Sequence, residues 1–125
     1  MDKSRVLSQI DSTKCLDFLA AMIRYKSYSG TPGESELARF MADSMKGFGL
    51  SADLQEVGDS RLNAIGRLKG AGGGASLLFN GHLDTNPATE GWTVDPWGGI
   101  YDKDFIYGIG VSNMMTGSEP SAVIW

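Results

Sequence analysis

The chain has 125 residues, a formal net charge of −4, 42% hydrophobic residues and a single cysteine, Cys15. This composition is that of a globular protein with a modest core, and it excludes a disordered tail. The isoelectric point near 4.8 and the lack of a basic patch argue against a nucleic-acid partner. No apolar run has the length of a membrane span or the form of a signal peptide. Because one cysteine cannot form an internal disulfide, we expect a cytoplasmic protein in a reducing compartment.

Two amphipathic helices are predicted in the first 50 residues. The first follows N-cap candidates at residues 11–13, and a loop at 27–33 (Ser-Tyr-Ser-Gly-Thr-Pro-Gly) separates it from the second. The second helix is predicted to begin near Glu34, and Gly47 and Gly49 are its candidate C-terminal stops. Their expected apolar stripes are Leu16, Leu19, Ala20 and Ile23 in the first helix, and Leu37, Phe40, Met41, Met45 and Phe48 in the second.

Two strands are predicted next, over residues 50–57 and 62–68, with a turn at 59–61 between them. The glycine-rich segment 69–75 (Lys-Gly-Ala-Gly-Gly-Gly-Ala) then forms a flexible turn. It is not a phosphate-binding loop, because no Gly-Lys-Ser/Thr ending follows it and a strand rather than a helix comes next.

The segment 76–85 (Ser-Leu-Leu-Phe-Asn-Gly-His-Leu-Asp-Thr) is predicted to contain the central, buried strand of the sheet. His82 and Asp84 stand at its carboxyl end, where ligands and catalytic groups collect in open α/β sheets. Because they are two residues apart, their side chains point to the same face of an extended strand. Such a histidine can bind a metal beside its carboxylate partner, act as a general base with an orienting carboxylate, or be a structural residue.

The remaining part of the chain is rich in glycine and tryptophan. In the loop 90–98, Trp92 and Trp97 either pack over the sheet edge, the interpretation we favour, or line a pocket. Residues 100–107 are predicted to form a short hairpin. Gly108-Ile109-Gly110 follows the hairpin, and it is a poor dinucleotide-binding signal because the third glycine and the helical pattern are missing.

Three motifs occur in the second half of the chain. They are Phe79-Asn80-Gly81-His82-Leu83-Asp84-Thr85, then Gly91-Trp92 with Asp95-Pro96-Trp97, then Tyr107-Gly108-Ile109-Gly110 with Asn113-Met114. In order and spacing they resemble the family of zinc aminoacylases, acetylornithine deacetylases, succinyl-diaminopimelate desuccinylases and glutamate carboxypeptidases. The resemblance covers most of residues 12–117. It implies an α/β fold, namely the N-terminal part of a zinc exopeptidase-like α/β/α catalytic domain with an incomplete mixed sheet.

The resemblance also implies a function, the metal-dependent hydrolysis of an amide bond in an N-acylated amino acid or small peptide. In the family, the strand-end histidine binds zinc and the aspartate two residues later orients its imidazole, so His82 becomes a metal ligand and Asp84 its catalytic partner. A second aspartate bridges two zinc (or cobalt) ions that polarise a water and the scissile carbonyl. Asn113 stands at this bridging position, and its neutral amide is a weaker bridging ligand than a carboxylate.

Other features of the family have no counterpart in these 125 residues. They are a Glu pair that supplies the general base and a metal ligand, a further acidic ligand, a second histidine, and a lid domain that often forms homodimers. The resemblance ends before residues 118–125, where Pro120 interrupts an expected helix. We therefore expect residues 1–125 to be the N-terminal portion of a metallohydrolase catalytic domain, without significant turnover alone. The alternative is a non-catalytic remnant that acts as a binding or interaction fragment.

Overall fold

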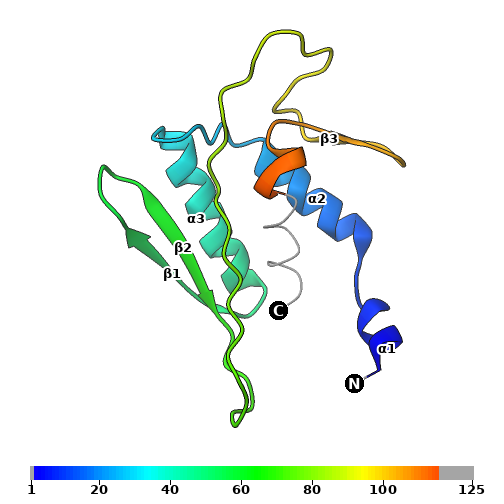
Figure 1. Ribbon diagram of the computed structural model, residues 1–125, viewed down its shortest axis with the longest axis vertical. Coiled ribbons are helices and arrows are strands. Elements are labelled where there is room, and N and C mark those ends of the chain that lie inside the picture. Colours follow the sequence, from blue (N-terminus) through cyan, green and yellow to red (C-terminus); the bar gives the residue numbers. More distant parts are fainter. Residues whose placement is uncertain (1, 116–125) are drawn as a thin grey trace.

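The computed structural model describes residues 2–115 of the chain (Figure 1). In chain order its elements are α1 (Lys3–Leu7), α2 (Ser12–Ile23), α3 (Pro32–Gly47), β1 (Ser51–Glu56), β2 (Leu62–Arg67), β3 (Ile100–Tyr101), β4 (Ile106–Tyr107) and the short helical turn η1 (Val111–Met115). This combination of helices and small sheets confirms the predicted α/β class. None of the described helices has the length and apolarity needed to cross a membrane.

The two predicted helices form close to the positions that the sequence pattern indicates. The Asp11 carboxylate caps α2 by accepting hydrogen bonds from the backbone N–H groups of Thr13 and Lys14, both at 3.1 Å. The helix α3 begins at Pro32, two residues before the predicted start. Proline is favoured there because the backbone N–H groups of the first helical turn have no acceptor within the helix, so the N–H that proline lacks is not missed.

Side chains from α2 and α3 form the core. The buried cluster consists of Leu19, Met22, Ile23, Leu37 and Met41. Phe40 extends it, with its ring centroid 5.5 Å from that of Phe18 and 5.2 Å from that of Tyr25. Phe48 is the C-cap residue of α3 and is 49% exposed, although its ring lies edge-on to that of Phe18 with centroids 5.8 Å apart.

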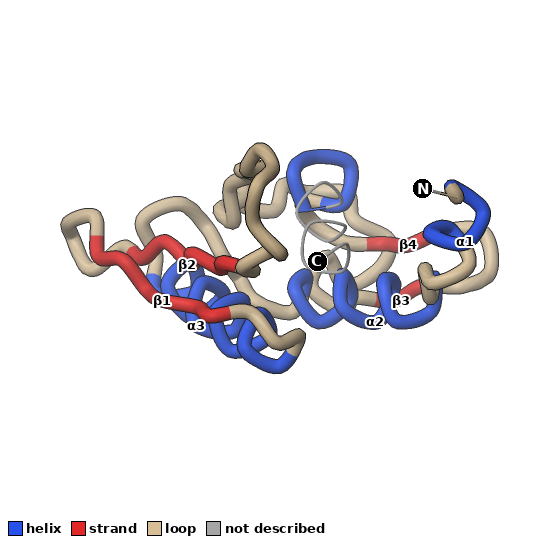
Figure 2. The backbone as a smooth tube through the Cα atoms, turned by 90° about the horizontal axis from the view of Figure 1, so that it is seen from below, coloured by secondary structure: helices blue, strands red, loops and turns tan. Residues whose placement is uncertain are grey.

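Two separate antiparallel hairpins lie beside the two helices (Figure 2). In the first, Ser51 pairs with Arg67 and Glu56 with Leu62, and α3 packs against both strands. In the second, β3 pairs with β4 next to α2. The predicted strands around the turn at 59–61 and the predicted hairpin at 100–107 are both confirmed.

The predicted central strand is the point at which the structure differs most from the sequence pattern. Residues 76–84 form no ladder with other described residues, and Leu77 and Leu78 are 70% and 84% exposed. Only Thr85 pairs, in a parallel bridge with Tyr28. A buried strand needs hydrogen-bonding neighbours along its edges and side chains over its faces, and the described residues supply these only at its carboxyl end. The prediction of a buried strand is therefore wrong for this part of the chain.

Two glycines of α3 offer a matched test of the packing at its ends. A Cβ atom at Gly33 would overlap the carbonyl oxygen of Lys26 in the preceding loop, whereas one at Gly47 would meet nothing within 4 Å. We expect Gly33→Ala to lower the free energy of unfolding by about 1–3 kcal/mol, because the backbone must shift. Gly47→Ala should raise it by about 0.4–1 kcal/mol. Urea unfolding followed by circular dichroism measures both, and equal effects would contradict the close approach at Gly33.

Candidate functional site

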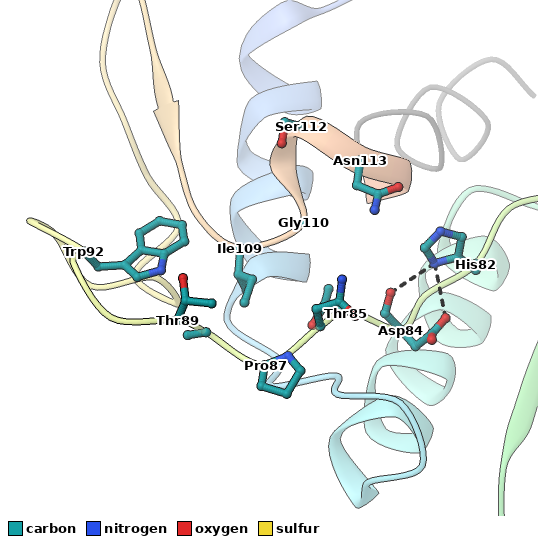
Figure 3. Close-up of a pocket in the computed structure, with 12 residues that line it drawn as sticks. His82, Asp84, Thr85, Pro87, Thr89, Trp92, Ile109, Gly110, Ser112 and Asn113 are labelled. Carbon is teal, nitrogen blue, oxygen red and sulfur yellow. Dashed lines mark hydrogen bonds and ion pairs between the residues drawn. The ribbon is translucent and has the colours of Figure 1, made fainter.

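A cavity of about 270 Å³ lies between the segment that begins at residue 82 and the chain around η1 (Figure 3). His82, Asp84 and Asn113, the three candidate site residues of the sequence, all line this cavity. The other lining residues are Thr85, Asn86, Pro87, Ala88, Thr89, Trp92, Ile109, Gly110 and Ser112. The structure thus brings together residues from two motifs that lie about thirty positions apart in the chain.

The His82 imidazole is held through its Nδ1 atom. This nitrogen lies 3.0 Å from the backbone carbonyl oxygen of Asp84 and 3.2 Å from Asp84 Oδ1 (dashed lines in Figure 3). Both partners are acceptors when the carboxylate is ionised, so Nδ1 carries the proton. In the neutral imidazole, Nε2 therefore keeps its lone pair. The sequence spacing anticipated the shared face of the two side chains but not the part played by the Asp84 carbonyl.

Asn113 reaches the cavity from η1 (Figure 3). Its backbone interrupts the helical turn, with φ −119° and ψ −136°, and its N–H donates to the Gly110 carbonyl oxygen at 3.0 Å. The side-chain amide offers one neutral oxygen as a potential metal ligand, because its nitrogen carries two hydrogens and donates only.

The loop between α2 and α3 holds the segment that carries His82 and Asp84. Ser27 is fully buried, and its hydroxyl donates to the Leu83 carbonyl oxygen at 2.9 Å. The Thr85 N–H donates to the Ser27 carbonyl oxygen at 2.8 Å, and the Ser29 N–H donates to the Thr85 carbonyl oxygen at 3.3 Å. Sequence reasoning did not identify Ser27 as a site-supporting residue, and the Ser-rich composition of this loop was the available signal.

The two tryptophans of the 90–98 loop have different roles. Trp92 lines the cavity and is 40% exposed. Trp97 packs edge-on against Tyr28, with ring centroids 6.1 Å apart, and the Lys26 ammonium lies 4.4 Å from its ring centroid. The favoured interpretation of structural packing therefore holds for Trp97, and the pocket interpretation holds for Trp92.

Thr85 places a further polar group at the cavity. The residue is 8% exposed, and its hydroxyl has no hydrogen-bond partner among the described residues. Buried hydroxyls are ordinarily paired, so this one is available for a water or a ligand.

The residues around His82 do not by themselves complete a catalytic metal centre. Within residues 2–115, no group of three or more His, Cys, Asp or Glu side chains is arranged to hold a metal ion. A catalytic zinc site ordinarily has three protein ligands and one open position. His82 and Asp84 fit one ligand and its orienting partner, and a metal bound there would need ligands from outside the described residues.

Fold and site together define an α/β protein that presents an oriented imidazole to a cavity. No family model matches the chain. Over 113 residues the chain is 31% identical to the succinyl-diaminopimelate desuccinylase of Nautilia profundicola, and the aligned region covers 88% of this chain and 28% of that protein. Over 104 residues it is 30% identical to the acetylornithine deacetylase of Aliivibrio fischeri, and the aligned region covers 78% of this chain and 27% of that protein.

A third relative is the succinyl-diaminopimelate desuccinylase of Wolinella succinogenes, 28% identical over 102 residues, with 82% of this chain and 26% of that protein covered. The chain spans about a quarter of the length of the curated relatives it matches. These similarities confirm the predicted resemblance: the chain belongs to the family of succinyl-diaminopimelate desuccinylases and acetylornithine deacetylases. Enzymes with these names are deacylases, a class of hydrolases.

Removal of the Ser27 hydroxyl tests how the site segment is held. We expect Ser27→Ala to lower the free energy of unfolding by about 1–3 kcal/mol, because the partly buried Leu83 carbonyl loses its hydrogen-bond donor. The matched control is Ser35→Ala, which removes an exposed hydroxyl bond of 2.7 Å to the Ser60 carbonyl and should change stability by less than about 0.5 kcal/mol. Hydrogen exchange at the Thr85 amide should become faster in Ser27→Ala alone. Unchanged exchange there would contradict the role of Ser27.

Proposed function

We propose that this chain supplies a histidine ligand and its orienting aspartate to a metal-dependent hydrolase. The substrate is an N-acylated amino acid or small peptide, and its amide bond is cleaved. The observation that carries the proposal is the His82 imidazole, which is held at Nδ1 by Asp84 and keeps its Nε2 lone pair beside the cavity. Metal-binding histidines are typically oriented in this way by a carboxylate or a carbonyl. The similarity to a desuccinylase and a deacetylase supports the amide-cleaving chemistry.

In this proposal each of the three candidate residues has a different role. His82 is the metal ligand, and Asp84 orients it. Asn113 takes the bridging position, where its neutral oxygen attracts a cation less strongly than the carboxylate that the family resemblance implies. The ion is zinc, or cobalt in its place, with two ions in a full-length enzyme.

A separate proposal concerns which part of such an enzyme residues 1–125 represent. We propose that they form the N-terminal portion of the catalytic domain, because the chain spans about a quarter of its relatives. The general base, the further ligands and a lid domain that forms a homodimer then belong to other parts of such an enzyme. The single cysteine fits a reducing compartment such as the cytoplasm.

A second candidate function is that of a non-catalytic fragment that binds another protein. The observation that favours it is the exposure of Leu77 and Leu78, at 70% and 84%, in an extended segment. Extended apolar segments of this kind accept an added strand from a partner. This function would need no imidazole, so the effect of substituting His82 separates the two candidates.

Metal titration of variants tests the proposed ligand set. Because the described residues offer only His82 and the neutral oxygen of Asn113 as ligands, we expect the chain to bind Zn²⁺ weakly. In isothermal titration calorimetry His82→Ala should abolish this binding, and Asp84→Asn should weaken it by about 10–100-fold. Asn113→Asp should strengthen it, because a charged carboxylate replaces a neutral amide. The control is Asp53→Asn, which removes a carboxylate on β1 that is 70% exposed and should leave the affinity unchanged. If His82→Ala bound Zn²⁺ like the wild-type chain, the proposed ligand would be wrong.

A steady-state assay tests the expected lack of turnover. We expect the 125-residue chain, supplied with zinc or cobalt, to show no significant hydrolysis of N-acetyl amino acids, because the described residues offer one oriented imidazole and no group of three ligands. The matched sample is His82→Ala under the same conditions. Hydrolysis by the wild-type chain that disappears in His82→Ala would contradict this expectation and would show that the site is complete.

A further inference from the structure

One ion pair of the described chain differs from the others in its burial. It joins Glu34, in the first turn of α3, to Arg61, at the end of the turn between β1 and β2. Arg61 Nη2 lies 2.7 Å from Glu34 Oε1, and Arg61 Nε lies 3.1 and 3.2 Å from the two carboxylate oxygens. The Glu34 side chain is only 10% exposed, whereas both partners of the other three Lys/Arg pairs are at least 49% exposed. Such a bidentate, half-buried pair specifies geometry much more strongly than a surface pair does.

Glu34 also connects this pair to the loop that supports the site. Its Oε2 atom accepts a hydrogen bond from the Gly30 N–H at 2.7 Å. Gly30 has a φ of +74°, a left-handed conformation that glycine adopts without strain, so the loop 27–31 turns at the residue that Glu34 holds. The same loop pairs with the backbone of Thr85. One carboxylate therefore ties Arg61 to the loop that fixes the carboxyl end of the site segment.

The Asp84 carboxylate also contributes, at longer range, to the charges around Arg61. The pKa of Arg61 is raised, first by its hydrogen bond to Glu34 and by the charge of that carboxylate, and further by the charges of Asp84 and Asp59. The guanidinium therefore stands within electrostatic range of the carboxylate that contacts His82. Arg61 does not line the cavity, so its influence on the site passes through Glu34 and the loop.

We infer that Glu34 and Arg61 are positioning residues of the His82–Asp84 pair. Together they hold the loop 27–31, and the pairing of this loop with Thr85 holds the neighbouring Asp84, so that Asp84 remains directed at His82 Nδ1. The inference rests on the proposed function in one respect, the role of the imidazole as a metal ligand. The placement of the imidazole is a property of the folded chain and does not depend on that role. Loss of Arg61 leaves the Glu34 carboxylate without its cation and loosens the loop.

The single histidine of the chain makes this inference measurable without metal or substrate. At about pH 8, above the ordinary histidine pKa of about 6.5, the two-bond ¹H–¹⁵N spectrum of the wild-type ring should show one tautomer with its hydrogen on Nδ1. Arg61→Met should give averaged ring tautomers and should speed hydrogen exchange at the Thr85 amide by about tenfold or more. Glu34→Gln should act in the same direction, and Arg61→Lys, which restores the charge but not the fork, should recover part of the wild-type spectrum.

The matched control is Arg67→Met on the same hairpin, whose exposed partner Asp53 lies 3.0 Å away. It should leave the ring spectrum and the Thr85 exchange unchanged. A purely structural role for Arg61 would lower the unfolding temperature without altering the ring tautomer of the folded protein. A wild-type ring spectrum in folded Arg61→Met would therefore overturn the inference.

A second pair of variants covers the case in which Arg61→Met does not fold. Wild-type ring spectra in both Glu34→Gln and Arg61→Lys would then overturn the inference. Failure of the wild-type chain to bind Zn²⁺ through His82 is a different result, because it would overturn the proposed function and leave the ring tautomer as it is.

Discussion

The site of this protein depends on the contact between the loop that follows α2 and the segment that carries the histidine. Ser27 and Leu83 are 56 residues apart in the chain, and a hydrogen bond from the Ser27 hydroxyl to the Leu83 carbonyl joins them. Ser27 itself is fully buried. The parallel pairing with Thr85 adds two backbone hydrogen bonds beside it. Since the loop itself is closed onto α3, the helical core determines where His82 and Asp84 lie. The position of the imidazole is thus set by contacts with this loop and, through the loop, with the helical core.

The chain is well packed around its helices and much less so along the segment that precedes the site. Met22, Ile23 and Leu37 are completely buried, whereas Leu77 and Leu78 are mostly exposed. Apolar surface of this kind on extended backbone favours association, because both side chains and backbone groups gain from a neighbouring strand. The segment 76–85 is therefore held by the loop at its carboxyl end, and its exposed part offers an apolar surface that another chain segment or another protein can cover.

The cavity combines an oriented imidazole with few other groups that could bind a metal. His82 is oriented by two acceptors of Asp84, which selects the tautomer that a metal ligand needs. Asn113 contributes a neutral oxygen, and the described residues contain no third acidic or imidazole ligand nearby. Family membership and the deacylase names of the relatives agree with a role in amide hydrolysis. The chain spans about a quarter of the length of these relatives.

The sequence alone determined the features that depend on short spacing. The helices α2 and α3, the two hairpins and the shared face of His82 and Asp84 follow from local sequence patterns and capping, and the order of three motifs identified the family. Only the tertiary structure decided the exposure of the segment 76–84, the different roles of Trp92 and Trp97, and the support of the site by Ser27 and by the Glu34–Arg61 pair. These depend on contacts between residues 27 or more positions apart, and no local pattern specifies which distant neighbour a side chain will meet.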